Sequence, residues 1–292
     1  MTSIHTHFHH DGSLRYIKFK NIHGLHRLDG PSYLSWYTNG QLEYQTYYID
    51  DKFNNFFNKE TKQTIPAFQS WYLNGQLWSK QYYINCKLNN FFDKNTKQTI
   101  PAYQSWYGNG QLQYQKYRIN NKPNNFFNKN INQTIPSDQS WGGGGQLKCQ
   151  SYCVNGKRNN FFNKDTNQTI PAFQSWYDNG QICIRDYIIN GKHNNFFNHE
   201  TNQTIPACQR WHPNGQSDYQ NYYINHHFIS HQNFDILYYI LTYHIKKYLH
   251  TIHSRNKLKA YKEHIAMQEH ICRPDGPIAN DLKLSFESKT KN

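Results

Sequence analysis

Few residue types that bind metals or act as nucleophiles stand at a useful spacing in this sequence. Cys149-x-x-x-Cys153 brings two thiols close together, and imidazole groups of the N-terminal histidines can bind transition metals. These histidines are His5, His7, His9 and His10. A flexible N-terminus lacks the surrounding hydrogen bonds that orient metal ligands, and no second cysteine pair stands at ligand spacing. We therefore expect no metal site and no cofactor.

Acid–base and phosphate chemistry are also poorly supported. Carboxylates such as Glu60, Asp165 and Glu200 stand at variable turn positions, so no pair for general acid–base catalysis can be named. The glycine run 142–145 stands where sister segments have a hairpin turn, and no helix is expected after it. We predict that the protein is not an enzyme and has no small-molecule substrate.

The composition is basic and aromatic. The chain has 292 residues, 32 Lys and Arg against 19 Asp and Glu, and a net charge of +13. Such a charge attracts nucleic acid, anionic lipid or an acidic protein. We find no stripe of Lys or Arg in the repeat frame, which favours a charge that is spread over solvated faces.

The six cysteines fall at scattered positions of the repeat described below. A disulfide framework in a repeat protein should itself repeat, so we expect free thiols in a reducing compartment. The polar N-terminus shows no signal peptide, and no apolar run is long enough to span a bilayer. These observations predict an intracellular, cytoplasmic protein.

A period of 35 residues organises most of the chain, in six copies. The tryptophans at this period are Trp36, Trp71, Trp106, Trp141, Trp176 and Trp211. The turn pairs at the same period are Asn39-Gly40, Asn74-Gly75, Asn109-Gly110, Asn179-Gly180 and Asn214-Gly215. Asn-Gly between two aromatic runs is a strong signal for a β-hairpin with a two-residue type I′ turn. Such a turn pairs Tyr72 with Leu77.

Each unit contains more than this hairpin. The apolar alternation slips by one residue inside the second strand, which predicts a β-bulge near Gln45-Thr46. A second tight turn follows, most plainly at Asn155-Gly156 and Asn190-Gly191. The rest, from Asn-Asn-Phe-Phe to Gln-Thr-Ile-Pro, is expected to be a short strand or an excursion that both phenylalanines anchor.

The fold class that follows is mainly β, a tandem β-hairpin array of six 35-residue units in an extended meander sheet with a short C-terminal helical segment. Stacked Trp and Tyr ladders are expected to hold the units together as a core, or else to form an exposed aromatic platform. The tyrosine ladder comprises Tyr47, Tyr82, Tyr117, Tyr152, Tyr187 and Tyr222. We expect a half-repeat and leader at 1–31, the repeats at 32–228, and a basic helical tail at 229–292.

The tail changes pattern after Asn233. Apolar residues including Phe234, Leu237, Leu241 and Ile245 recur at helical spacing, among many lysines and histidines. The segment either caps the open edge of the array or lies on an anionic membrane or in an acidic groove.

The motifs resemble a known repeat family. Tyr-x-Asn-Gly-Gln-Leu, then Tyr-Tyr-Ile-Asn-Gly-Lys, then the run from His26 to Pro31 are similar to the variant MORN repeats of YwqK-like antitoxin proteins. The sequence looks most like the expanded forms of these repeats in giant DNA viruses of amoebae. The resemblance to the family covers roughly residues 8–226. It implies a β-hairpin array without catalytic residues, used for protein or membrane contacts, here in a virus-infected host cell. The chain departs from the family by a longer link in five units.

Function is expected to be that of a non-catalytic scaffold for protein–protein interaction with an unknown partner. Its outward positions vary between units as a binding face would: Glu43, Trp78, Gln113, Lys148, Cys183 and Asp218. One alternative is nucleic-acid binding through the basic and aromatic surface. Another is membrane association through the basic C-terminal segment.

Overall fold

The computed structural model describes residues 2–164, 166–198, 201, 203–224 and 227–229. The chain divides into two compact units, Met1–Cys183 (unit 1) and Ile184–Asn292 (unit 2). All regular structure among the described residues is β-strand, as the sequence predicted. The described part contains no helix that is long and apolar enough to cross a membrane. The helix predicted after Asn233 lies outside the described residues.

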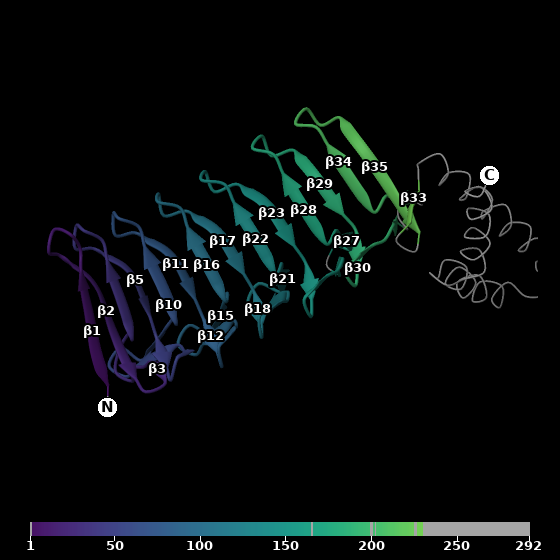
Figure 1. Cartoon of the computed structure of the whole chain (residues 1–292). Helices are drawn as coiled ribbons and strands as arrows, with labels where there is room; N and C mark the ends of the chain where they lie inside the picture. Colours follow the sequence, from purple (N-terminus) through teal and green to yellow (C-terminus); the bar gives the residue numbers. More distant parts are fainter. Residues whose placement is uncertain (1, 165, 199–200, 202, 225–226, 230–292) are drawn as a thin grey trace, which may run out of the picture. The chain divides into compact units, whose positions relative to one another are not determined.

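Every repeat opens with a hairpin of two longer strands, here called the first hairpin. In unit 1 its strands are β4 (Tyr33–Trp36), β5 (Leu42–Thr46), β10 (Phe68–Trp71), β11 (Leu77–Gln81), β16 (Tyr103–Trp106), β17 (Leu112–Lys116), β22 (Asp138–Trp141), β23 (Leu147–Ser151) and β28 (Phe173–Trp176). They follow β1 (Ser3–Phe8) and β2 (Leu14–Asn21) in one antiparallel meander, in chain order from β1 to β28 (Figure 1). The short strand β3 (Gly24–Leu25) pairs with β2.

Unit 2 repeats the same pattern. In this unit residues 184–186 of β29 (Ile182–Asp186) are followed by β34 (Cys208–Trp211), β35 (Ser217–Ile224) and β36 (His227–Ile229), which pair antiparallel in that order. The long meander of repeated hairpins therefore confirms the predicted fold class in each unit.

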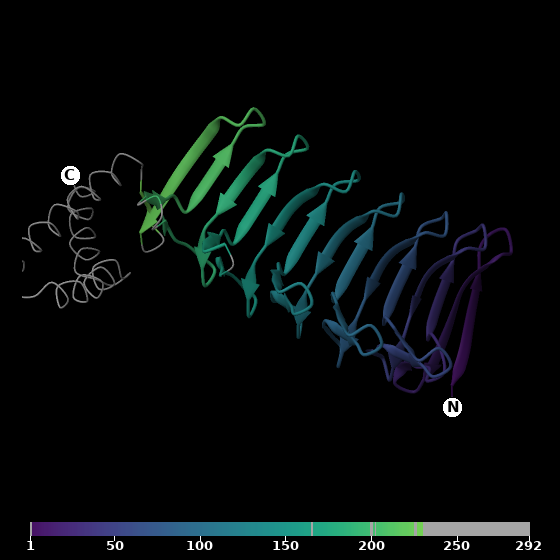
Figure 2. The ribbon, with the colours of Figure 1, turned by 180° about the vertical axis from the view of Figure 1, so that it is seen from behind.

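Two short hairpins complete each of the first five repeats. The second-hairpin strands are β6 (Tyr48–Ile49), β7 (Lys52–Phe53), β12 (Tyr83–Ile84), β13 (Lys87–Leu88), β18 (Arg118–Ile119), β19 (Lys122–Pro123), β24 (Cys153–Val154), β25 (Lys157–Arg158), β30 (Ile188–Ile189) and β31 (Lys192–His193). The third-hairpin strands are β8 (Phe56–Asn58), β9 (Gln63–Ile65), β14 (Phe91–Asp93), β15 (Gln98–Ile100), β20 (Phe126–Asn128), β21 (Gln133–Ile135), β26 (Phe161–Asn163), β27 (Gln168–Ile170), β32 (Phe196–Asn198) and β33 (Gln203–Ile205). In unit 1 both short hairpins lie at the end of the first hairpin that is opposite its turn (Figures 1 and 2).

The second-hairpin turns match the sequence prediction. Cys153 pairs with Arg158 and Val154 with Lys157, which leaves Asn155-Gly156 as a two-residue turn. Both turn residues have positive φ, 51° for Asn155 and 87° for Gly156, as a type I′ turn requires. The prediction of a tight turn here is confirmed.

The first-hairpin turn differs from the predicted type I′ geometry. Trp71 pairs with Leu77, and the Tyr72 and Gln76 backbones bond across a three-residue loop. Within that loop Gly75 has a φ of +80°, while Asn74 accepts the Gln76 N–H through its side chain at 3.1 Å. A three-residue loop needs a left-handed residue at its last position only, which glycine supplies. The expected pairing of Tyr72 with Leu77 is therefore wrong.

The bulge also lies elsewhere than predicted. Gln45 and Thr46 pair in regular register with Leu34 and Tyr33, so no bulge stands there. The register shifts beside the turn, where Trp36 faces Leu42 and one residue of β5 is left over. The alternation of apolar residues shifts by one position because β5 ends at Thr46 and Tyr47 lies between two hairpins.

The densest packing is at the junction between hairpins. Tyr47 is buried there and stacks on Phe56 of the third hairpin, with ring centroids 5.1 Å apart. The residue after each proline of the 35-residue period, Ala67 after Pro66 for example, is fully buried, which leaves room for a small side chain only. In the first four Asn-Asn-Phe-Phe segments just the first phenylalanine anchors its hairpin, since the second one, Phe57 for example, is exposed. The expectation that both phenylalanines are anchors is thus corrected.

Candidate binding surfaces

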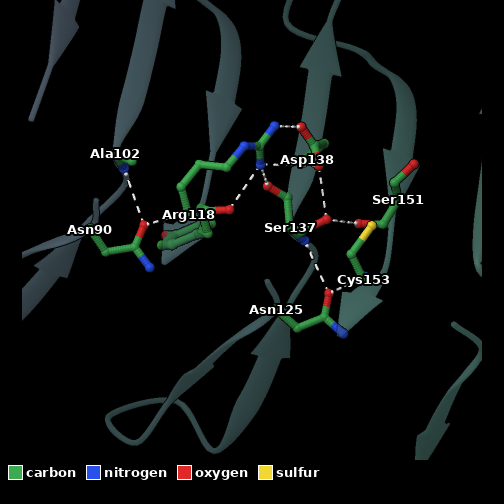
Figure 3. A network of polar contacts seen from close by, with 9 residues as sticks. Asn90, Ala102, Arg118, Asn125, Ser137, Asp138, Ser151 and Cys153 are labelled. Carbon is green, nitrogen blue, oxygen red and sulfur yellow. Dashed lines mark hydrogen bonds and ion pairs between the residues drawn. The ribbon is translucent and has the colours of Figure 1, made fainter. Parts of the chain in front are cut away.

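The asparagine before each phenylalanine pair joins neighbouring repeats. The Asn90 side-chain oxygen accepts the Ala102 N–H at 3.2 Å and the Arg118 N–H of the next repeat at 2.8 Å (Figure 3). Asn55 and Asn125 make the same pair of bonds in unit 1, and Asn195 does so in unit 2. One amide oxygen thus satisfies two backbone donors of different hairpins, which fixes how successive repeats are placed.

A polar network replaces aromatic side chains between the third and fourth repeats. Arg118 pairs with Asp138 at 2.5 Å and donates to the Ser137 carbonyl at 3.2 Å (Figure 3). The Ser137 hydroxyl lies 2.8 Å from an Asp138 carboxylate oxygen and 3.0 Å from the Ser151 carbonyl, and these two acceptors share its single hydrogen. Sister repeats hold Tyr48 or Tyr83 where Arg118 stands. The ion pair lets the fourth repeat keep the same hairpin register as its neighbours.

Tyrosines that begin the first turn add a third kind of connection. The Tyr37 hydroxyl donates to the Trp71 carbonyl, Tyr72 to Trp106, and Tyr107 to Trp141, each at 2.9 Å. These bonds link the turn end of each first hairpin to the next one. Together with the asparagines they hold both ends of the repeats in unit 1.

The ladder residues are placed differently from simple stacks. All six ladder tyrosines are buried, and those from Tyr47 to Tyr187 each stack on a phenylalanine of their own repeat, at 5.1 to 5.3 Å. The ladder tryptophans are partly exposed, and cations cover two of them: Lys80 lies over Trp106 and Arg185 over Trp211.

One face of the sheet is nearly the same in every repeat of unit 1, and we call it the uniform face. Glutamines of neighbouring repeats bond across it, Gln45 to Gln69 at 2.8 Å and Gln150 to Gln174 at 2.9 Å. The alternation of strand residues places the ladder tryptophans on this same face. Residues of the uniform face are Leu34, Gln45, Gln69, Lys80, Gln104, Gln115, Gln139, Gln150 and Gln174. Burial lowers the pKa of Lys80, where sister repeats hold a glutamine.

The opposite face, here the variable face, changes from repeat to repeat. Positions equivalent to Tyr33 hold Phe68, Tyr103, Asp138 and Phe173, and those equivalent to Tyr44 hold Ser79, Tyr114 and Cys149. Those equivalent to Thr46 hold Gln81, Lys116 and Ser151. Buried serines alternate with the residues of the Tyr44 row along the sheet, and one of them, Ser70, lies 2.7 Å from the Ser79 hydroxyl in a hydrogen bond.

Rings stack continuously across the first part of the variable face. His7, Tyr16, Tyr33, Tyr44 and Phe68 follow one another with centroids 5.1 to 6.1 Å apart and planes within 23° of parallel. Burial raises the pKa of Tyr33 well above its usual value. Because these rings cover one another's faces, they offer edges and hydroxyls to a ligand.

The residues that the sequence singled out as variable lie at the bulges. Glu43, Trp78, Gln113, Lys148 and Asp218 are each the unpaired residue of a register shift beside the turn. A bulge re-aims its side chain. The Glu43 carboxylate accepts a bond from Ser35 of the variable face at 2.7 Å, whereas Trp78 remains 47% exposed.

The histidines and cysteines also have definite places. Ser3–Phe8 pairs with β2, so the N-terminal segment is a strand and not the flexible end that the sequence suggested. His9 bonds the Trp36 carbonyl at 2.9 Å. The cysteines within the described ranges are free, and burial raises the pKa of Cys153 and, to about 11, of Cys208. No group of three or more metal-ligating side chains gathers among the described residues.

The repeat frame contains a basic row that the sequence reading missed. Lys52, Lys87, Lys122, Lys157 and Lys192 recur at one position of the second hairpin. The interpretation that Lys and Arg form no stripe is therefore wrong. Comparing the repeats column by column reveals this row, just as it separates the uniform from the variable face.

Family comparison agrees with this geometry. Two segments match the MORN repeat variant family. They are residues 32–50 and 67–85, each of which spans a first hairpin and the opening strand of the second hairpin. MORN repeats generally act as modules for protein or membrane interaction and are generally not enzymes. No curated protein matches the chain.

Proposed function

We propose that the protein is a non-catalytic repeat scaffold that binds a protein partner through the variable face of unit 1. The observation that carries this proposal is the contrast between the two faces of one sheet. Glutamine and tryptophan recur on the uniform face, whereas Tyr33, Asp138 and Phe173 occupy one equivalent position on the other. An irregular protein surface is recognised by side chains that differ from place to place.

The connections between repeats support a preformed binding surface. Asn90 fixes the short hairpins and Tyr72 fixes the turn end of the neighbouring first hairpin. A surface that is already ordered loses little conformational entropy on binding, so affinity can come from few exposed anchors. Trp78 and Tyr114, which are 47% and 40% exposed, are the anchors we expect to matter most.

Finer assignments follow from the repeat itself. We propose that the chain is an expanded MORN-like form similar to the repeats of YwqK-like antitoxins and of giant amoebal viruses. The third hairpin supports this proposal, because it replaces a short link by a structured excursion. We place the protein in the cytoplasm, since its cysteines do not recur in the repeat frame as a secreted disulfide framework would.

Sister repeats supply substitutions that preserve the fold. On the variable face we would exchange the half-buried Tyr44 and the exposed Trp78 and Tyr114 for residues already present at equivalent positions: Tyr44→Ser, Trp78→Gln and Tyr114→Ser. The matched control changes the uniform face by the same rule: Leu34→Gln, Gln115→Lys and Gln150→Lys. Proximity labelling in cells is then compared for the native chain and both variants.

We expect a specific labelled partner that the variable-face variant loses and the uniform-face variant keeps. Removing the two exposed anchors together with Tyr44 should weaken such a complex by at least tenfold. Equal labelling by all three proteins, or loss only with the uniform-face variant, would show that the variable face is not the binding surface.

A further inference from the structure

Two rows of side chains at the short-hairpin end of unit 1 repeat with the period of the array. The first row is basic. Lys52, Lys87, Lys122 and Lys157 are exposed, and none of them forms an ion pair within the described part of the chain. Unpaired ammonium groups on a regular spacing create a line of positive potential.

Hydrogen bonds hold successive second hairpins together, so the row is fixed in space. Asn121 N donates to the Leu88 carbonyl at 2.9 Å, and Gly156 N donates to the Pro123 carbonyl at 2.9 Å. Each repeat adds two sheet strands, which separates successive lysine positions by about 10 Å.

The second row is aromatic and lies on the third hairpins. Phe57, Phe92, Phe127 and Phe162 are 55%, 54%, 50% and 50% exposed. Throughout the described residues none of these four rings contacts another ring, in contrast to the stacked tyrosines of the variable face and of the hairpin junctions. Lys59, Lys94, Lys129 and Lys164 follow two residues after these rings and are exposed. Neighbouring third hairpins also touch, because Asn95 Nδ2 donates to the Lys62 carbonyl at 3.0 Å.

We propose that this end of unit 1 binds single-stranded nucleic acid, with phosphates on the lysines and unpaired bases against the exposed phenylalanines. The proposed surface is separate from the variable face and extends beyond the scaffold role. Rings with free faces can stack on any base, and a basic groove follows the backbone without reading sequence.

The regularity of the rows favours this ligand over a protein or a bilayer. A uniform row suits a polymer whose charges repeat, whereas lysine is depleted from protein–protein interfaces. A membrane-binding surface buries a continuous apolar face. Here each ring stands alone among polar groups such as Asn58, Gln63 and Thr64.

The test uses the full-length chain and a fluorescein-labelled 30-nucleotide oligo(U), with an RNA duplex of equal length beside it. Fluorescence anisotropy is measured over a range of salt concentrations. The ring variant carries Phe57→Leu, Phe92→Leu, Phe127→Leu and Phe162→Leu, which keep apolar area but remove the aromatic face. The lysine variant carries Lys52→Gln, Lys87→Gln, Lys122→Gln and Lys157→Gln.

A control variant loses the same number of lysines elsewhere, and it shows whether binding depends on this row or only on the total positive charge. It carries Lys18→Gln, Lys20→Gln, Lys116→Gln and Lys148→Gln, which lie on the sheet strands or at a bulge. Far-UV circular dichroism checks that every variant keeps its β-structure.

We expect the native chain to prefer oligo(U) and the ring variant to bind it at least fivefold more weakly. The slope of log K against log salt should fall by about 3 in the lysine variant, because four phosphate contacts are lost. The control variant should change this slope by less than half of that amount. No measurable binding at low salt would overturn the proposal, as would equal losses in both lysine sets or unchanged oligo(U) binding by the ring variant. Binding to phosphatidylserine vesicles that the ring variant keeps and the lysine variant loses, without oligo(U) binding, would assign this end to membranes instead.

Discussion

At the scale of single residues, the asparagine that joins neighbouring repeats is the side chain on which the array depends most. The Asn90 oxygen is the acceptor for the Ala102 and Arg118 N–H groups. Asn90→Ala leaves two partly buried donors without a partner, at a cost of about 1–3 kcal/mol each. We therefore expect the free energy of unfolding to fall by about 2 kcal/mol or more, measured by urea unfolding with tryptophan fluorescence.

The adjacent asparagine provides the control. The Asn89 side chain makes one exposed bond, to Asn120 at 3.1 Å, so Asn89→Ala should change stability by about 0.5 kcal/mol or less. Asn90→Asp keeps an oxygen acceptor and should be milder than Asn90→Ala. Similar losses for Asn89→Ala and Asn90→Ala would contradict the assigned role.

Sequence reading missed this asparagine for a physical reason. Asn-Asn-Phe-Phe shows an obvious apolar pair, whereas an amide bond to the backbone of residue 118 depends on contacts 28 positions away. The same holds for Phe56 and Phe57, which are adjacent and identical in type, yet only Phe56 packs on Tyr47. Which of them is inward is decided by strand alternation, once the third hairpin is known to exist.

At the scale of elements, all second hairpins have a type I′ turn, but the residue types at its two positions differ between repeats. Cys86 stands at its second position with a φ of +61°, where Gly156 and Gly191 stand in later repeats at +87° and +82°. A side chain in the left-handed region costs about 1–2 kcal/mol relative to glycine. Cys86 is exposed, so Cys86→Gly loses little packing and should stabilise the protein by about 0.5–1 kcal/mol, measured as a shift in the urea midpoint.

The reverse substitution, at the same turn position of a later repeat, tests whether backbone strain is the cause. A Cβ at Gly156 would meet only the Lys122 side chain, at an ordinary 3.5 Å, so Gly156→Cys introduces backbone strain without a clash. It should destabilise by a similar amount. If Cys86→Gly destabilises the chain, the φ argument does not govern this turn.

Turn chemistry shows how far local sequence can be read. Asn155-Gly156 predicts its two-residue turn correctly, because the flanking strands pair directly on each side. Asn74-Gly75 has the same residues, but Leu73 enlarges its loop to three and moves asparagine out of the left-handed region. The misplaced bulge has a related cause, since its signal was the end of a strand at Thr46 and not an inserted residue.

At the scale of the whole molecule, the exact period made the meander predictable, while the surfaces were not. A strict period with Trp and Asn-Gly at fixed positions predicts repeated hairpins whatever their detailed register. Assigning a face requires that register. Only once Tyr33 pairs with Thr46 and Ser35 with Tyr44 do these columns fall on one side of the sheet. The variable face, which carries the proposed binding site, therefore follows from the structure more than from the sequence.

The junction tyrosines make the whole array sensitive to alkali. Burial raises the pKa of Tyr82 and Tyr117 to about 12 and shifts that of Tyr47 and Tyr152 in the same direction, from an ordinary value of 10.0. The neutral phenol is thus favoured in the folded state. This contribution to stability is fully present below pH 10 and is lost as the pH rises toward about 12. Because every repeat holds such a tyrosine at the junction of its hairpins, the loss should affect all repeats together.

Thermal unfolding followed by circular dichroism from pH 8 to 12 measures this dependence. We expect the Tm to stay nearly constant up to pH 10 and then to fall steeply. A variant with Tyr82→Phe and Tyr117→Phe keeps the stacks on Phe91 and Phe126 but cannot ionise, so its decline should begin at higher pH. Tyr114→Phe, at a 40% exposed ring of the sheet, should leave the profile of the native chain unchanged. A decline that is identical in the native chain and the double variant would mean that other groups, and not the buried phenols, limit stability in alkali.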